Sequence, residues 1–124
     1  NNAGIQTREI MEDKIVKTSK VAVEIGLNEN NLPVQMRWTA EDGEVKNAPA
    51  KAMLLSLWDP SNNNTMKIDL WTKDMSVEEM KQFFHQTLVS MAASFEKATN
   101  DEKMSATMRD FCAYFAEKLE IVKE

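Results

Sequence analysis

Hydrophobic and polar residues alternate along the first half of the chain with the period of two that is typical of half-buried β-strands. The alternating segments come in two pairs, and each pair is separated by a short polar stretch rich in asparagine, a residue that favours turns. The segments are 20–27 with 32–39, and 51–58 with 65–71. The pattern therefore predicts two antiparallel β-hairpins.

The strand register follows from placing every apolar pair on one face of the sheet. In the first hairpin, pairing Leu27 with Leu32 puts Ile25 opposite Val34 and extends the apolar face to Val21 opposite Trp38 and Val23 opposite Met36. In the second, the predicted pairs are Trp58 with Thr65, Leu57 with Met66, Leu55 with Ile68, and Met53 with Leu70.

Two central segments are less regular. Residues 40–49 are polar and contain the turn dipeptide Asp42-Gly43, so they are predicted to form a loop. Residues 50–59 contain alanines and leucines that would tolerate a helix. The segment is short, however, and ends at Asp59-Pro60 before an evident strand, so it is predicted to be a strand.

Two helices are predicted at the C-terminal end, where apolar residues recur at helical spacing. Capping boxes of the S/T-x-x-E type begin them, Ser76 with Glu79 and Thr99 with Glu102. The stripes are Val77, Met80, Phe84, Leu88, Met91 and Phe95, then Met104, Met108, Phe111, Cys112, Phe115 and Leu119. The predicted fold class is α+β: a four-stranded antiparallel sheet followed by an antiparallel two-helix hairpin packed on one sheet face (ββββαα).

Composition narrows the class of protein. The 124 residues, 43% hydrophobic and 28% charged, suit one globular domain, predicted over 14–124. Residues 1–13 are predicted to be a disordered segment or an addition before a natural start at Met11. A net charge of −5 without a basic stripe argues against nucleic acid, and no apolar run is long enough to insert into a membrane. The single cysteine suits a reducing compartment, so a cytoplasmic location is expected.

Catalytic chemistry has weak support. His85 is the single histidine, and Cys112 lies on the apolar stripe of the second helix, where a buried and inert thiol is the ordinary outcome. No glycine-rich phosphate loop and no zinc-ligand spacing is present. The expectation is a non-enzymatic protein with no catalytic residue, no metal site and no cofactor.

The strongest candidate for function is the sheet face turned away from the helices. A fully solvated face would not ordinarily carry several large apolar side chains, and here they lie near charged ones. The candidate interaction surface consists of Arg37, Leu54, Trp58, Asp69 and Trp71. A secondary candidate is Tyr114 with Ile121, seven residues apart and off the main stripe, for which packing against the first helix is the simpler explanation.

The runs DLWTKDM (69–75), FFHQTL (83–88) and DEKM (101–104) resemble the gliding-motility-associated GldC family of Bacteroidota. The similarity covers the chain from about residue 20 to residue 123. It implies a cytoplasmic accessory protein of the gliding machinery, with no enzyme class, catalytic residue or cofactor to carry over.

Three functions are compatible with these observations. The first is an interaction or assembly factor of the motility or secretion machinery, acting on other proteins through the open sheet face or as a homo-oligomer. The second is a client-binding module like a secretion chaperone, an analogy at the level of fold. The third is a small-ligand-binding domain or enzyme using a pocket near His85 and Cys112.

Overall fold

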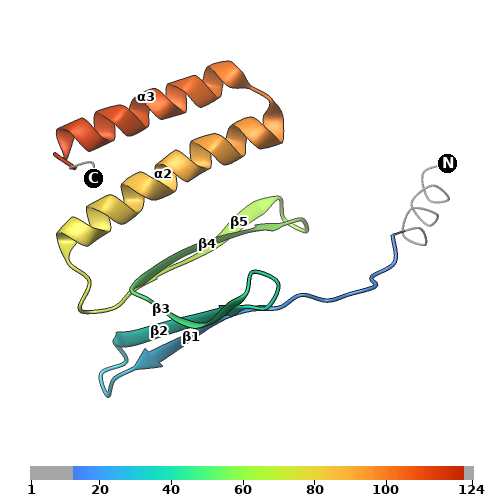
Figure 1. Cartoon of the computed structure of the whole chain (residues 1–124), viewed down its shortest axis with the longest axis vertical. Coiled ribbons are helices and arrows are strands. Elements are labelled where there is room, and N and C mark those ends of the chain that lie inside the picture. Colours follow the sequence, from blue (N-terminus) through green and yellow to red (C-terminus); the bar gives the residue numbers. More distant parts are fainter. Residues whose placement is uncertain (1–12, 122–124) are drawn as a thin grey trace. The chain divides into compact units, whose positions relative to one another are not determined.

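The computed structural model describes residues 13–121, and the chain divides after Lys73 into two compact units (Figure 1). The strand unit, as described from residue 13 to residue 73, contains the β-strands, and the helical unit, from residue 74 to residue 121, contains two helices. Residues 1–12, most of the predicted disordered segment, lie outside the described part of the chain.

The strand unit contains five strands, within the described residues, arranged in two antiparallel sheets. The first sheet has the order β1-β2-β3, and the second pairs β4 with β5. Their bounds are β1 Val21–Leu27, β2 Pro33–Ala40, β3 Val45–Ala50, β4 Ala52–Asp59 and β5 Asn64–Trp71. The α+β class is therefore confirmed, whereas the prediction of one four-stranded sheet is wrong.

The additional strand is β3, which lies in the segment predicted to be a loop. Its residue Asn47 adopts a left-handed backbone with φ of 52°, which interrupts the alternation that normally reveals a strand. The Asn47 N–H donates to Thr39 Oγ1 at 3.0 Å where the β2–β3 register shifts. Pro49 is tolerated because β3 is an edge strand, so the missing N–H breaks no central ladder.

The β1–β2 pairing differs from the prediction by two residues. Ile25 lies opposite Met36, and Val23 lies opposite Trp38. The connecting loop is longer than expected because the Asn28 N–H donates to the Leu32 carbonyl, and the register also shifts between Gly26 and Leu27. A shift of two residues keeps each side chain on its face, so the same residues remain on the apolar side.

The β4–β5 pairing matches the prediction at every position. Trp58 lies opposite Thr65, and Ala52 lies opposite Trp71. The Thr72 N–H donates to the Lys51 carbonyl at 2.8 Å, which continues the β4–β5 pairing by one residue. The Lys73 N–H, just past β5, donates to the carbonyl of Pro33 in β2 at 3.0 Å and so connects the two sheets. Lys51 is thus the point at which the chain leaves one sheet and enters the other.

The helical unit is an antiparallel hairpin of α2 (Val77–Thr99) and α3 (Glu102–Lys118), as predicted (Figure 1). The expected capping box begins α2. The Glu79 N–H donates to Ser76 Oγ at 3.0 Å, and the Ser76 N–H donates to Glu79 Oε1 at 2.9 Å. Both donors at this helix end are thereby satisfied.

Replacing Ser76 with alanine is expected to lower the free energy of unfolding of the helical unit by about 1 kcal/mol, because the Glu79 N–H loses its acceptor. Urea unfolding followed by ellipticity at 222 nm measures this loss. Ser90, an exposed serine inside the same helix, provides the control. Ser90→Ala should leave stability unchanged or slightly raised, and an equal loss in both variants would contradict the cap.

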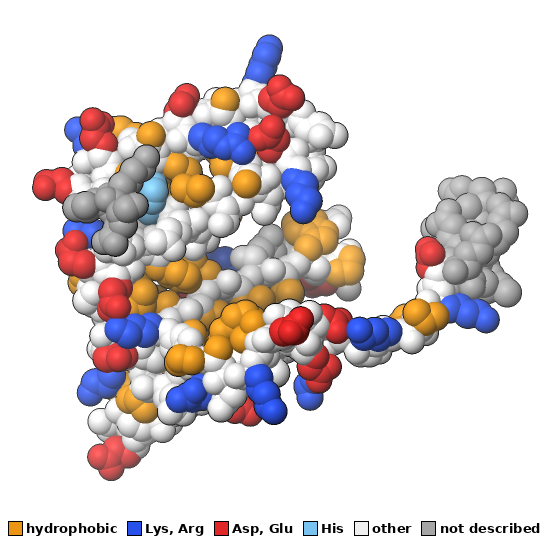
Figure 2. Space-filling view, in the orientation of Figure 1, with side chains coloured by type: hydrophobic (Ala, Val, Ile, Leu, Met, Phe, Trp, Pro, Cys, Tyr) orange, Lys and Arg blue, Asp and Glu red, His pale blue; other side chains and the backbone are white. Residues whose placement is uncertain are grey.

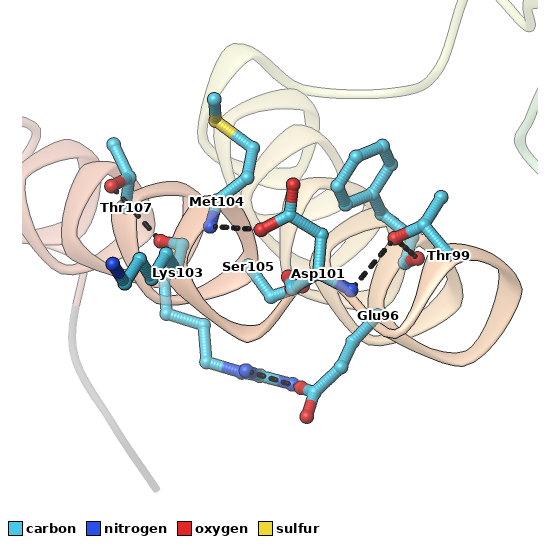
Figure 3. A network of polar contacts seen from close by, with 9 residues as sticks. Glu96, Thr99, Asp101, Lys103, Met104, Ser105 and Thr107 are labelled. Atoms are coloured by element: carbon cyan, nitrogen blue, oxygen red, sulfur yellow. Dashed lines mark hydrogen bonds and ion pairs between the residues drawn. The ribbon is translucent and has the colours of Figure 1, made fainter.

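The second capping box is not formed as predicted. The N-cap of α3 is Asp101, whose carboxylate accepts from the Met104 N–H at 2.9 Å (Figure 3). Thr99 still belongs to α2 and donates to the Phe95 carbonyl at 2.8 Å. The helices are therefore closer in sequence than expected, with Asn100 in left-handed backbone ending α2.

Candidate interaction surface

The face of the β4–β5 hairpin that carries the tryptophans is set by strand alternation. Because side chains on every second residue share a face, and because opposite residues share it too, the register defines the whole set. This tryptophan face consists of Ala52, Leu54, Ser56 and Trp58 from β4 and of Thr65, Lys67, Asp69 and Trp71 from β5.

The two tryptophans are exposed at opposite ends of this face. Trp58 is 63% exposed and Trp71 is 50% exposed, while Leu54 is 37% exposed. Trp71 pairs with Ala52, six residues before Trp58, so the indoles are roughly 20 Å apart along the hairpin. Leu54 is the diagonal neighbour of Trp71, and the small or polar residues Ser56, Lys67 and Asp69 occupy the space between the two ends.

Arg37 does not belong to the tryptophan face. It lies on β2 in the other sheet, opposite Pro49, and its Nη1 donates to the Asn47 carbonyl at 3.0 Å. The prediction that it shares a sheet face with the tryptophans followed from the single four-stranded sheet and is wrong for the same reason. The structure thus places Leu54, Trp58, Asp69 and Trp71 on one face and Arg37 elsewhere.

The opposite face of the hairpin is also exposed, which the sequence did not indicate. Alternation assigns Met53, Leu55, Leu57, Met66, Ile68 and Leu70 to this side, and the periodicity predicted a buried core face. Leu57, Met66 and Ile68 are nevertheless each more than half exposed. Exposed apolar surface of this extent is typical of a surface that binds another protein.

The secondary candidates are separated by the end of α3. Tyr114 is exposed on the helix, and Lys118 Nζ lies 5.8 Å from its ring centroid. Ile121 lies beyond the helix, after Glu120 in left-handed backbone, and its N–H donates to the Ala116 carbonyl. Helical spacing therefore does not place Ile121 beside Tyr114, and its structural role is to complete the helix end.

The groups that suggested catalysis have ordinary structural surroundings. His85 stacks on Phe115 with ring centroids 6.2 Å apart, and Cys112 on α3 is buried. Among residues 13–121, no three histidine, cysteine or acidic side chains lie close enough to hold a metal ion. In an exposed loop, the Ser19 hydroxyl and, to a smaller extent, the Lys17 ammonium lower the pKa of Asp42.

The surface carries apolar side chains between its charged ones, as Figure 2 shows for one side of the molecule. Within residues 13–121, neither helix combines the length and the apolar character that a membrane span requires.

Comparison with known proteins gives one match. The family model described as gliding motility-associated protein GldC-like matches residues 33–121. This range runs from the start of β2 to the end of the described chain and contains both hairpin faces and both helices. No curated protein and no solved structure gives a significant match.

Proposed function

Because the chain belongs to the GldC-like family of gliding motility-associated proteins, we propose that it acts as a non-enzymatic accessory factor of the gliding machinery. In this proposal it works from the cytoplasm, and it binds or helps to assemble other protein components.

The observation that supports this function is the exposure of Trp58, Leu54 and Trp71 on one face of a two-stranded hairpin. Tryptophan is enriched at the energetic centres of protein interfaces because it contributes a large apolar area at little entropic cost. Exposing two of them to water is unfavourable unless a partner covers them. Their spacing of roughly 20 Å fits a partner segment of about six residues in extended conformation.

The edges of the hairpin strengthen this proposal. The sheet formed by β4 and β5 contains no further strand within residues 13–121, so each strand has one unpaired edge. A partner strand can add to such an edge through main-chain hydrogen bonds, while its side chains contact the adjacent face. The tryptophan face would then provide specificity, and the strand edge would provide affinity.

The test is affinity capture from host cells with the full chain as bait. The variant Trp58→Ala/Trp71→Ala should fold normally, because both side chains are at least half exposed. It should lose about 30-fold or more in affinity for each genuine partner, as expected for two interface tryptophans. Quantitative mass spectrometry of the captured proteins measures the loss.

The control is Thr65→Ala/Lys67→Ala, which changes two polar residues of the same face. Partners retained equally by the wild type, the tryptophan variant and this control would exclude the tryptophan face as the binding surface.

A second candidate function is the binding of unfolded clients, in the manner of a secretion chaperone. The observation that favours it is the exposure of Leu57, Met66 and Ile68 on the side of the hairpin opposite the tryptophans. Such a protein should slow the aggregation of a model client, and Leu57→Ser/Ile68→Ser should remove that effect. Absence of any effect by the wild-type chain would contradict this alternative.

A further inference from the structure

Apolar residues of both helices recur in alternating steps of three and four residues, from Phe84 to Phe95 in α2 and from Met104 to Phe115 in α3. This spacing, with a mean of 3.5 residues, is the a/d pattern through which helices pack against other helices in bundles and coiled coils. In α2 the series is Val77, Phe84, Leu88, Met91 and Phe95, and in α3 it is Met104, Met108, Phe111 and Phe115. We refer to these nine residues together as the helical seam. Val77 lies one heptad before Phe84, and Lys81 occupies the position between them.

Most of the helical seam lies away from the line along which α2 and α3 contact each other, although Phe115 at its end stacks on His85 of α2. We infer that this line runs through the small buried residues of the two helices, because Ala92 and Ser105 are 0% exposed and Cys112 is 5% exposed. At 100° per residue, the seam of each helix is rotated about the helix axis by about 80° from this contact line. The direction of rotation is the same in both helices when each is viewed from its own N-terminus. Because the helices are antiparallel, both halves of the seam face the same side of the hairpin.

The side of the helical hairpin that carries the seam is mostly apolar, and the other side carries an ion pair between the helices. Val77, Phe84, Met91, Met104 and Phe111 are between 40% and 67% exposed. Across the other side, Arg109 Nη1 and Glu96 Oε1 form an ion pair of 2.8 Å between the helices (Figure 3). The hairpin thus has the polarity of one half of a four-helix bundle.

We propose that the helical seam packs against the same seam of a second copy of this chain, forming a four-helix bundle across a two-fold axis. A two-fold interface must be complementary to itself, and two matching a/d seams satisfy that condition. The Arg109–Glu96 ion pair lies on the side away from this interface. Lys81, which occupies a seam position, pairs with Glu78 of its own helix at 3.5 Å.

The available area is sufficient for such a dimer. The five most exposed seam residues present roughly 500 Å² of surface per copy, taking 150–250 Å² for each fully exposed large side chain. Complete burial of this surface in both copies would remove about 1,000 Å² from water, which is the lower limit for a specific interface. The proposal concerns the helices and does not depend on the function proposed for the tryptophan face.

The experiment is sedimentation velocity of the full chain over a wide concentration range. The wild type is expected to reach twice the chain mass of 14.2 kDa. Met91→Glu and Phe111→Glu should each raise the dimer dissociation constant by about 100-fold or more, because a charge would be buried without a partner. Met91→Ala, which removes apolar area without adding charge, should raise it by about tenfold and covers the case in which the glutamate variants misfold.

Gln86→Glu is the matched control, because it places the same charge on the exposed side of α2 away from the seam. This control and Trp58→Ala/Trp71→Ala should keep the wild-type mass. A wild-type chain that stays monomeric at every concentration would overturn the proposal. A dimer that persists unchanged in the folded seam variants would overturn it as well.

Discussion

Replacing Met36 with alanine is expected to lower the free energy of unfolding of the strand unit by about 3 kcal/mol. Met36 is 2% exposed and lies between Ile25 and Ala50, its neighbours across β1 and β3. Truncation would leave a cavity in the centre of the three-stranded sheet, and few other side chains in this unit are buried. The loss is therefore a large fraction of the stability expected for a domain of this size.

The readout for Met36→Ala is urea unfolding followed by tryptophan fluorescence, because all three tryptophans of the chain lie in the strand unit. Met66 provides a control of the same residue type that is 56% exposed on β5. Met66→Ala should change stability by less than about 1 kcal/mol. Equal losses in the two variants would mean that Met36 is not the centre of the sheet packing.

Replacing Ala92 with leucine is expected to destabilise the helical unit by about 3 kcal/mol, the upper part of the range for overpacking a close contact. Ala92 on α2 and Ser105 on α3 are completely buried, and Cys112 on α3 is nearly so, which we attribute to the contact between the two helices. Small side chains at this line let the helices approach closely. Three additional carbon atoms would force the helices apart or distort the leucine rotamer.

Ellipticity at 222 nm during urea unfolding measures the effect of Ala92→Leu, since the regular helices of the described chain are in this unit. The adjacent Ala93 is exposed, so Ala93→Leu adds the same atoms to the surface and should be close to neutral. If both leucine variants were equally stable, the close contact between the helices would be contradicted.

The parts of the fold that could be predicted are those in which a single period persists. The β4–β5 register followed from uninterrupted alternation, and α2 followed from its capping box and its apolar spacing. Strand β3 could not be predicted because Asn47 breaks the alternation and Pro49 argues against a strand. The β1–β2 register was wrong because turn chemistry indicates where a turn lies but not how many residues it contains.

The candidate interaction surface could be predicted only in part, because alternation identifies shared faces only within strands whose pairing is correctly predicted. Alternation placed Leu54, Trp58 and Trp71 on one face, whereas Arg37 was assigned to it through a sheet that does not form as one piece. Periodicity also identifies which side chains are apolar without saying what covers them. The β-hairpin face that carries Leu57 and the helix face that carries Phe111 were therefore assigned to a core, although both residues are exposed. The 3.5-residue spacing around Phe111 was nevertheless visible in the sequence.

The most direct test of the central claim, that the tryptophan face binds a protein partner, is photocrosslinking in host cells. A photoreactive phenylalanine analogue at position 71 should give a specific crosslink to a partner of the motility machinery, because Trp71 is half exposed on that face. The same analogue at position 93, on the exposed surface of α2, should not. No crosslink at position 71, or the same products from both positions, would contradict the account.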